Sequence, residues 1–213
     1  MTAEPRPETG LRERKKLRTR YAIISAAVTL FVERGYDETS VAEIAEAAEI
    51  GTRTFFRYFA TKDEVALALI AEADEGIVRE LQARPTEEPP VTALANAARA
   101  VVEQLMQADD GTGELWVRIQ WLLENSPPLL AAHFQRALSI EDRLARHLAE
   151  REGVDPDTDL RPFLTVGTVG TALRAAHSQW STLSEGTSED LIRLRDQALQ
   201  TLHEPLDRHW AHS

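Results

Sequence analysis

Two arginines four residues apart, Arg53 and Arg57, lie in a short segment rich in aromatic and basic side chains, residues 52–59 (TRTFFRYF). Residues four apart share one face of a helix, and an arginine guanidinium can donate two parallel hydrogen bonds to the O6 and N7 atoms of a guanine. Phe55 and Phe59 have the same spacing and are predicted to face a core. The segment therefore predicts a helix with a buried aromatic face and an exposed face of donors that could enter the major groove of DNA.

Another helix is predicted to support this segment from the N-terminal side. Its apolar stripe recurs at helical spacing and consists of Leu17, Ile24, Val28 and Phe31. This predicts a first helix of about four turns. Gly35 follows the stripe at the place where a helix-stopping residue is expected, so the chain should turn there.

A short second helix is predicted between that turn and the aromatic segment. Its apolar face consists of Val41, Ile44, Ala45 and Ala48. Thr39 or Ser40 can cap it, and Glu43 has the capping-box spacing from Ser40. Two brief helices about four residues apart, the second starting with small polar residues and an arginine, have the layout of a helix-turn-helix.

The charge of the chain is distributed unevenly. The formal net charge is −11, yet residues 1–62 hold 11 basic and 9 acidic residues, whereas the remainder holds 13 basic and 26 acidic residues. Residues 12–20 contain six basic residues around the single Glu13. This pattern favours a basic arm that binds polyanions and an acidic body that avoids them, with a solvated basic tail as the alternative.

The stretch from Leu17 to Leu69 resembles the N-terminal DNA-binding domain of the tetracycline-repressor (TetR) family. The residues that carry the resemblance are Ala26, Ala27, Phe31, Gly35 and Tyr36, with the runs 39–45 (TSVAEIA), 52–59 (TRTFFRYF) and 61–64 (TKDE). The resemblance implies a homodimer whose small N-terminal domains read double-stranded operator DNA. It also implies larger helical C-terminal domains that dimerise and usually bind a small molecule.

Two positions depart from the family's pattern. Glu49 stands where the family often has glycine in the turn, and Gly51 stands where it often has a Ser or Thr cap. A residue other than glycine in a left-handed conformation costs about 1–2 kcal/mol, so Glu49 is expected to loosen or slightly reshape the turn. Glycine as a cap costs only a few tenths of a kcal/mol relative to serine. The departures leave the fold prediction intact but put a cap contact to DNA in doubt.

Eight residues are candidates for contact with DNA: Ser40, Thr52, Arg53, Thr54, Phe56, Arg57, Tyr58 and Lys62. Arg53, near the start of its helix, is expected to contact a guanine, while the two threonines could touch base edges or a thymine methyl group. Phe56 can pack on sugar or base.

The remaining candidates are expected at phosphates. By resemblance, Tyr58 donates its hydroxyl to a phosphate, and Ser40 and Lys62 would bind phosphates at two helix N-termini. For Arg57, Tyr58 and Lys62 the alternative is a solvated surface side chain.

The rest of the chain shows helical patterns throughout, with a fourth helix capped by Thr61 and continuing to Arg84. We therefore expect an all-α fold, with an N-terminal three-helix helix-turn-helix domain plus a larger C-terminal helical bundle, about nine helices in total, and a dimer. The expected division is a flexible basic arm over residues 1–16, a DNA-binding domain over 17–62, and a ligand-binding and dimerisation domain over 63–213.

The last two helices are expected to form the homodimer interface. The first of them, predicted over residues 156–184, carries a flank of small side chains: Thr165, Gly167, Thr168, Gly170 and Thr171. Each glycine inside a helix costs about 1 kcal/mol, so close packing by another helix should compensate. The final helix is striped by Leu191, Leu194, Ala198, Leu202 and Leu206, with Pro205 expected to kink or shorten it. Two such helices per subunit could build a four-helix interface.

The effector is unknown, and its site should show aromatic and polar residues where a bundle core is normally aliphatic. The candidates are Trp116, Trp121, Phe134, Phe163, His177 and Trp180, with Arg118 or Arg174 as partners for an anion. The alternative for each is an ordinary core or surface position. His203, His209 and His212 are expected to be exposed imidazoles rather than metal ligands, and no metal or cofactor is expected.

Several function classes are excluded by composition and motif. The chain has no cysteine, which excludes disulfides, thiolate zinc sites and cysteine nucleophiles. Its N-terminus does not resemble a signal peptide, and its longest uncharged stretch, residues 162–173, is too short to span a bilayer, so a cytoplasmic protein without membrane contact is expected.

The function expected is a TetR-family regulator, a repressor that binds a pseudo-palindromic operator and is released by a small molecule. One alternative is a DNA-binding dimer controlled by a protein partner without an effector. The other is an enzyme on a helical bundle, which is disfavoured because the chain has no phosphate loop, metal-binding spacing or nucleophile with its base.

Overall fold

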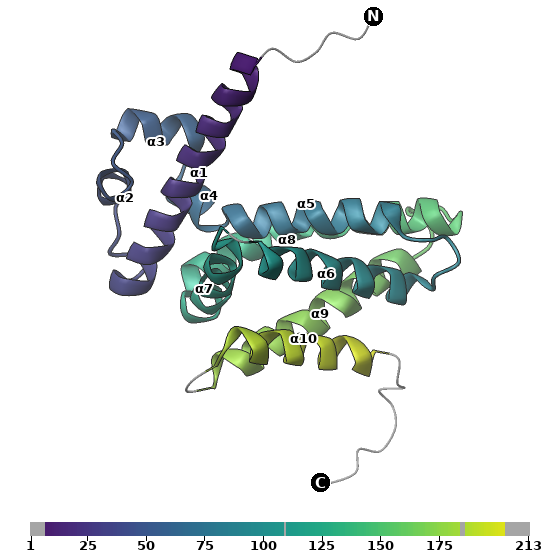
Figure 1. The fold of residues 1–213 in the computed structure, drawn as a ribbon. Coiled ribbons are helices and arrows are strands. Elements are labelled where there is room, and N and C mark those ends of the chain that lie inside the picture. Colours follow the sequence, from purple (N-terminus) through teal and green to yellow (C-terminus); the bar gives the residue numbers. More distant parts are fainter. Residues whose placement is uncertain (1–6, 109, 184–185, 203–213) are drawn as a thin grey trace, which may run out of the picture. The chain divides into compact units, whose positions relative to one another are not determined.

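The computed structural model describes residues 7–108, 110–183 and 186–202, and within them it contains ten α-helices and no strand (Figure 1). The helices are α1 (Pro7–Arg34), α2 (Val41–Ala47), α3 (Thr52–Tyr58), α4 (Lys62–Ala66), α5 (Ala68–Ala83), α6 (Pro90–Gln107), α7 (Thr112–Asn125), α8 (Pro127–Glu152), α9 (Arg161–Ser181) and α10 (Ser188–Thr201). The all-α prediction is confirmed. The additional helix arises because the predicted fourth helix is interrupted at Leu67, where φ is −95° and ψ is 6°.

The chain divides into two compact units, residues 1–68 and residues 69–213. The first ends six residues beyond the boundary expected at residue 62. None of the described helices is both long enough and apolar enough to cross a membrane.

In the first unit, α1 begins much earlier than the sequence pattern suggests. Residues 7–16, expected as part of a flexible arm, are helical, with Pro7 at the first position of the helix, where a missing N–H costs nothing. Leu17 was expected on the buried stripe but is 63% exposed, because the buried face of α1 starts at Ile23. The basic residues 12–20 therefore lie on a helix.

The core of the first unit is formed where α1 packs against α2 and α4, and α2 packs against α3. Its deeply buried apolar side chains include Ile23, Ile24, Ala27, Val28, Phe31, Ile44, Ala45, Phe55, Phe59 and Val65. Gly35 ends the first helix as predicted, with φ at 94°, a left-handed value that favours glycine. Tyr36 then folds back so that its ring centroid lies 5.1 Å from that of Phe31.

The second unit contains α6 to α10 and all of α5 beyond Ala68. Within it, α9 packs against α6, α7, α8 and α10. The core cluster consists of Val78, Leu81, Ala93, Leu94, Ala95, Ala97, Ile140, Leu144, Ala145, Leu148, Val166, Val169 and Leu199. Proline at the first position of α6 and α8 starts these helices, and Gly153, at φ 65°, ends α8.

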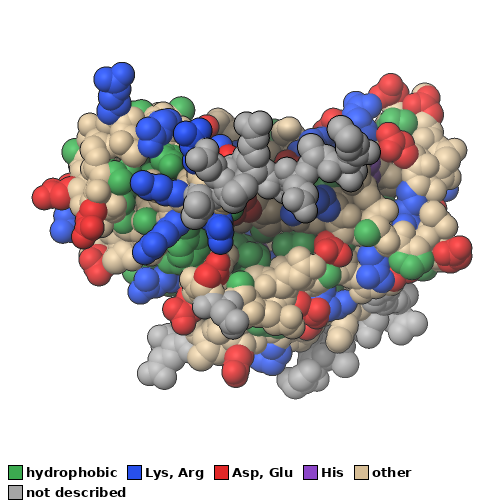
Figure 2. Space-filling model, turned by 45° about the horizontal axis from the view of Figure 1, so that its top comes forward, with side chains coloured by type: hydrophobic (Ala, Val, Ile, Leu, Met, Phe, Trp, Pro, Cys, Tyr) green, Lys and Arg blue, Asp and Glu red, His purple; other side chains and the backbone are tan. Residues whose placement is uncertain are grey.

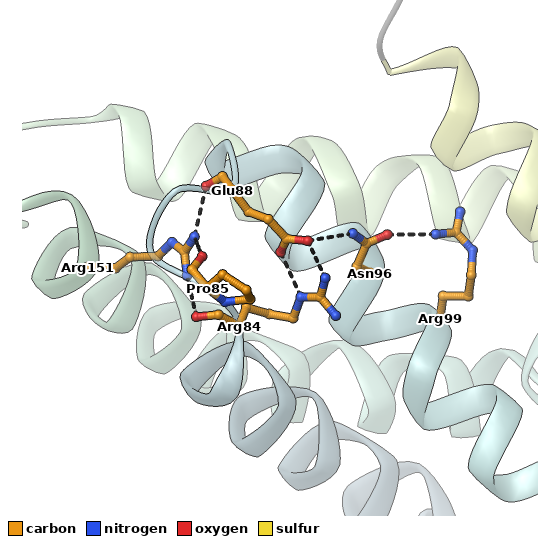
Figure 3. Close-up of polar contacts among 6 residues, drawn as sticks. All are labelled: Arg84, Pro85, Glu88, Asn96, Arg99 and Arg151. Atoms are coloured by element: carbon orange, nitrogen blue, oxygen red, sulfur yellow. Dashed lines mark hydrogen bonds and ion pairs between the residues drawn. The ribbon is translucent and has the colours of Figure 1, made fainter.

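A network of arginines fixes the connection between α5 and α6 (Figure 3). From α8, Arg151 donates hydrogen bonds to the backbone carbonyls of Arg84, Pro85 and Glu88. The Arg84 guanidinium pairs with the Glu88 carboxylate, which also accepts a hydrogen bond from Asn96 at 3.1 Å. The loop carbonyls that follow α5 are thereby satisfied by side chains, and one end of the bundle is tied together.

Of the last two helices, α9 is shorter than its predicted range, residues 156–184. α9 starts at Arg161 because residues 155–159 form a turn, in which the amide N–H of Asp159 donates to the carbonyl of Asp155 at 2.9 Å. α10 is capped by Thr187, whose hydroxyl accepts from the amide of Asp190 at 3.1 Å. The predicted kink at Pro205 and the stripe residue Leu206 lie outside the described residues.

Candidate nucleic-acid interface and ligand cavity

The α2 and α3 helices are joined by a tight turn at residues 48–51. The amide N–H of Ile50 donates to the carbonyl of Ala45 at 2.9 Å, and that of Thr54 donates to Gly51 at 2.8 Å. Glu49 adopts φ 54° and is the one non-glycine residue with positive φ among those described. Glu49 was expected to loosen or reshape the turn; instead it adopts the left-handed conformation itself, with an exposed side chain, and the hydrogen bonds of the turn are present. Gly51 caps α3 with no side-chain hydrogen bond.

The two faces of α3 differ as the spacing predicts. Phe55 is fully buried and Phe59 is 3% exposed, whereas Arg53 and Arg57 are exposed on the other side. Phe56 is 57% exposed, although its ring edge packs against Phe55 with centroids 5.5 Å apart. The buried rings of Phe55 and Phe59 therefore fix the orientation of α3 about its own axis, so Arg53 and Arg57 face outward.

The other α3 candidates lie along the same helix. Thr52 is exposed, and Thr54 and Tyr58 are half-buried. The guanidinium carbon of Arg57 lies 5.4 Å from the ring centroid of Tyr58, in cation–π range. The hydroxyl-bearing and basic side chains of α3 are therefore adjacent on one short helix.

Ser40 is the residue that caps α2. Its hydroxyl accepts from the amide of Glu43 at 3.3 Å, and the Glu43 carboxylate accepts from the Ser40 amide at 2.8 Å and from its hydroxyl at 2.7 Å. These hydrogen bonds, together with Arg34 at 2.9 Å, lower the pKa of Glu43. Both Ser40 donors are thus occupied by a complete capping box.

Lys62 lies at the start of α4 and is engaged within the unit. Its ammonium nitrogen donates to the carbonyl of Tyr36 at 2.7 Å and lies 4.2 Å from the centroid of the Tyr36 ring. The Tyr36 hydroxyl in turn donates to Asp63. Tyr36 was named only for the family resemblance, although its place directly after Gly35 and four residues before the Ser40 cap is the signal that puts it in the turn between α1 and α2, where its contacts join that turn to α4.

A second residue missed by sequence reasoning is Arg20. Its guanidinium carbon lies 4.6 Å from the ring centroid of Phe59, so α1 helps to hold the C-terminal end of α3. The signal was its place at the end of the basic block, directly before the buried stretch of α1.

Basic side chains are concentrated on the surface of the first unit. Lys and Arg side chains gather over this unit at the left of Figure 2. The exposed basic residues of α1 and α3 are Arg12, Arg14, Lys15, Lys16, Arg18, Arg34, Arg53 and Arg57. A surface of this kind attracts the phosphates of a nucleic acid.

The second unit contains a cavity of about 360 Å³ lined by residues of α5 to α10. Of the six residues predicted to line a ligand site, Trp116, Phe134 and His177 lie in its wall. Trp121 and Phe163 are 42% and 37% exposed and do not line it. Trp180 is buried elsewhere, with its indole N–H donating to the carbonyl of Thr187 at 2.9 Å. Of the two arginines suggested as anion partners, Arg174 lines the cavity and Arg118 does not.

A buried cation that sequence reasoning missed lies in the cavity wall. Arg195 of α10 is 7% exposed, and its Nη1 donates to Nε2 of His177 at 2.6 Å. Its guanidinium carbon lies 5.3 Å from the Trp116 ring centroid. Burial lowers the pKa of Arg195 to about 10, so it stays charged at neutral pH, and burial next to that cation lowers the pKa of His177 well below its ordinary value. The sequence signal was an arginine inside an otherwise apolar helical stripe.

Two carboxyl groups of the cavity wall are held in a poorly hydrated setting. Burial raises the pKa of Asp74 to about 6, opposed by Arg136 and assisted by Glu75. Burial also raises the pKa of Glu124, against the opposing effect of Arg174. The cavity therefore combines an apolar surface with a few polar groups, which is the composition of small-molecule sites.

A metal site is not formed by the described residues, since no group of three or more His, Asp or Glu is placed to hold an ion there. His203, His209 and His212 lie outside the described residues.

Comparison with known proteins identifies the family. Residues 23–69 match the family described as "Bacterial regulatory proteins, tetR family", and residues 88–207 match the "MftR C-terminal domain". The HTH-type transcriptional regulator TcmR of Streptomyces glaucescens is 40% identical over 203 residues, which cover 94% of this chain and 90% of TcmR.

Two solved structures share the fold. FadR of Thermus thermophilus, a TetR family transcriptional repressor crystallised in complex with lauroyl-CoA, is 28% identical, with a TM-score of 0.51 over 91% of this chain and 98% of FadR. The fatty acid degradation regulator FadR of Bacillus halodurans, 20% identical, superposes with a TM-score of 0.60 over 90% of this chain and 97% of its own.

The chain belongs to the TetR family of transcriptional regulators. Proteins of this family are DNA-binding regulators and not enzymes. They bind operator DNA and act as dimers.

Proposed function

We propose that this protein is a repressor that binds a pseudo-palindromic operator in the cytoplasm as a homodimer and leaves it when a small-molecule effector occupies the cavity of the C-terminal unit. The observation that carries the DNA-binding part is the outward pair Arg53 and Arg57 on a helix locked by Phe55 and Phe59. A rigid helix with donors on one side is what major-groove readout requires.

The roles proposed for the eight DNA-contacting residues follow their exposure. Arg53, with Thr52 and Thr54, reads bases, and Phe56 packs on sugar or base. Arg57, Tyr58 and Lys62 bind phosphates, and the Lys62 ammonium still has two N–H groups beyond the one given to Tyr36. Ser40 contributes chiefly through the geometry of α2, because its own donors are taken by Glu43.

The homodimer interface proposed for the last two helices rests mainly on α9. A side chain added at Gly167 would meet nothing within 4 Å, and one at Gly170 would meet only the Glu141 carboxylate at 3.8 Å. Both glycines line the cavity of this unit, so the open space beside them belongs to the cavity. The feature of α9 that favours an interface is Leu164, which is 64% exposed and which a second copy would cover. Leu191 and Leu194 of the α10 stripe are instead buried within the subunit.

Release by an effector is supported by the cavity and by the family. A protein controlled only by a protein partner needs no internal space, whereas this unit has about 360 Å³ of it. The Thermus FadR, a relative at 28% identity, is described with a bound acyl-CoA. If the effector prefers a conformation that operator DNA does not, each must weaken binding of the other by the same factor, typically worth about 1–3 kcal/mol.

The test of this function is the Arg53→Ala variant on duplexes that the wild-type protein selects from a random DNA library. Loss of a bidentate guanine contact should cost roughly 1–3 kcal/mol per half-site and relax the base preference at one position of each half-site. Fluorescence anisotropy gives the affinity, and repeating the selection with the variant gives the specificity. Arg118→Ala is the matched control, since it removes an exposed arginine from the other unit.

Two results would contradict the proposal. The first is a wild-type protein that remains monomeric and selects no sequence at low ionic strength. The second is an Arg53→Ala variant whose affinity and sequence preference equal those of Arg118→Ala.

A further inference from the structure

The wall of the C-terminal cavity holds a buried positive charge that has no negative partner within the described residues. No carboxylate oxygen in the described part of the chain lies in salt-bridge range of Arg195. The carboxylate of its neighbour Asp196 raises the pKa of Arg195 electrostatically but is itself paired with Arg99 at 2.7 Å. The group that accepts a hydrogen bond from Arg195 is the uncharged imidazole of His177. A buried charge without a counter-ion is costly, so its presence in a cavity calls for an explanation.

A second polar group in the same place is also unsatisfied. Trp116 is 3% exposed, and its indole N–H has no acceptor in the described structure. Its ring packs edge-on against His177, with centroids 6.3 Å apart, and faces the Arg195 guanidinium. A buried donor left without an acceptor loses the free energy of its hydrogen bond with water. Arg195 and Trp116 therefore form a cluster of donors that has no anionic acceptor in the described structure, and the indole N–H has no acceptor at all there.

The remaining wall of the cavity specifies the rest of the ligand. Most of it is aliphatic or aromatic, with residues such as Ile77, Leu94, Val102, Leu123, Phe134 and Leu173. The carboxyl groups in this wall belong to α5, α7 and α8, and Glu124 already has Arg174 as its charged neighbour. Arg195, the buried cation among the described residues of this wall, is therefore available to pair with an anionic group of a bound ligand.

Building on the proposed effector function, we infer that the effector is an apolar molecule with a single anionic oxygen group, such as a carboxylate or sulfonate, which pairs with Arg195 beside Trp116. The apolar body lies against the aliphatic and aromatic wall. Arg195 acts as the specificity-determining residue, because a neutral or cationic analogue of the same shape would leave the buried guanidinium uncompensated.

The test uses two fluorescent probes with the same aromatic body. 1-Anilinonaphthalene-8-sulfonate carries a sulfonate, and N-phenyl-1-naphthylamine lacks it. On the full-length wild-type protein the sulfonate probe should bind at least about tenfold more tightly, because a charge-assisted hydrogen bond in a buried site is worth that much. Arg195→Met should remove this preference and leave binding of the neutral probe within about twofold.

Arg174→Met is the matched control, since it removes a cation that lines the same cavity but is exposed and lies near Glu124. It should weaken the sulfonate probe far less than Arg195→Met. Ala98→Phe fills part of the cavity, so it should reduce binding of both probes and thereby show that they bind inside the cavity. Circular dichroism of each variant verifies that the helices are intact.

The outcomes separate this inference from the proposed function. Equal affinity for both probes, or equal effects of Arg195→Met and Arg174→Met, would overturn the anionic-ligand inference. If Ala98→Phe still blocked binding in that case, the result would continue to support an effector cavity. Absence of binding by both probes, or binding that ignores Ala98→Phe, would overturn the inference and the effector role together.

Discussion

The two units of this chain place their charged side chains differently: the first carries them on its outer surface, and the second has charged side chains in the wall of an internal cavity. In the N-terminal unit, apolar side chains such as Phe55 and Ile44 are fully buried, and the arginines point outward. In the C-terminal unit, the charged Arg195 and Asp74, whose pKa is raised by burial to about 6, line an internal cavity. A unit that reads DNA needs a rigid frame behind an exposed surface, whereas a unit that senses a small molecule keeps interior space and polar groups at a cost in stability.

The largest effect expected from this difference is at Asp74. The pKa of this carboxyl is about 6 in the folded protein, raised by burial from an ordinary value of 3.8. The folded state therefore holds its proton more tightly than the unfolded state, and stability falls as the pH rises from about 4 to about 6. Above that range the cost is fully present, about 3 kcal/mol by the size of the pKa change.

Asp74→Asn removes this titration, so the variant should be more stable than the wild type by up to about 3 kcal/mol at pH 7.5 and by little near pH 4. Urea unfolding followed by circular dichroism across this pH range measures the difference. Asp37→Asn, at an exposed carboxylate of the first unit, should show no comparable pH dependence. A difference between Asp74→Asn and wild type that does not change with pH would refute the account.

The next effect compares two alanines that are both 1% exposed, Ala45 in the helix-turn-helix core and Ala98 in the cavity wall. Ala45→Leu should destabilise by about 1–3 kcal/mol, since extra methylene groups in a filled core force side chains apart. Ala98→Leu can extend into the cavity, so its free energy of unfolding should change by less than about 1 kcal/mol. Chemical denaturation of both variants measures the two changes in the free energy of unfolding. Equal losses would mean that the cavity wall is as tightly packed as the other core.

The same contrast explains which features could be predicted from sequence. The Thr61 cap, the stop at Gly35 and the inward faces of Phe55 and Phe59 depend on residues within a few positions, so spacing alone identified them. For the α2 cap, spacing left Thr39 and Ser40 as candidates, and the structure selects Ser40. The extent of α1 was missed because polar residues can continue a helix without any apolar stripe.

The cavity depends on contacts between helices far apart in sequence, and residue type alone could not decide which aromatic side chains face it. Trp116 and Trp121 lie on the same helix, yet only Trp116 reaches the cavity. Arg195 and Asp74 carried a usable signal, because each interrupts an apolar stripe, Leu191-Leu194-Leu199 and Ile70-Ala73-Ile77. Charged residues at such positions predict a lined cavity better than aromatic residues do, since an aromatic side chain is equally at home in a filled core.

The smallest effect lies at the turn that positions the reading helix. Glu49 holds φ at 54°, which costs a residue other than glycine about 1–2 kcal/mol, and Glu49→Gly would relieve it. Glycine also gives the unfolded chain more freedom, worth roughly 0.5–1 kcal/mol, so the net gain should be below about 1 kcal/mol. Glu46→Gly, at an exposed helical position three residues earlier, should instead destabilise by about 1 kcal/mol. Urea denaturation distinguishes the two signs. If both variants lose stability, the left-handed conformation of Glu49 does not strain the turn. The helix-turn-helix that carries Arg53 and Arg57 would then be more rigid than the φ value of Glu49 suggests.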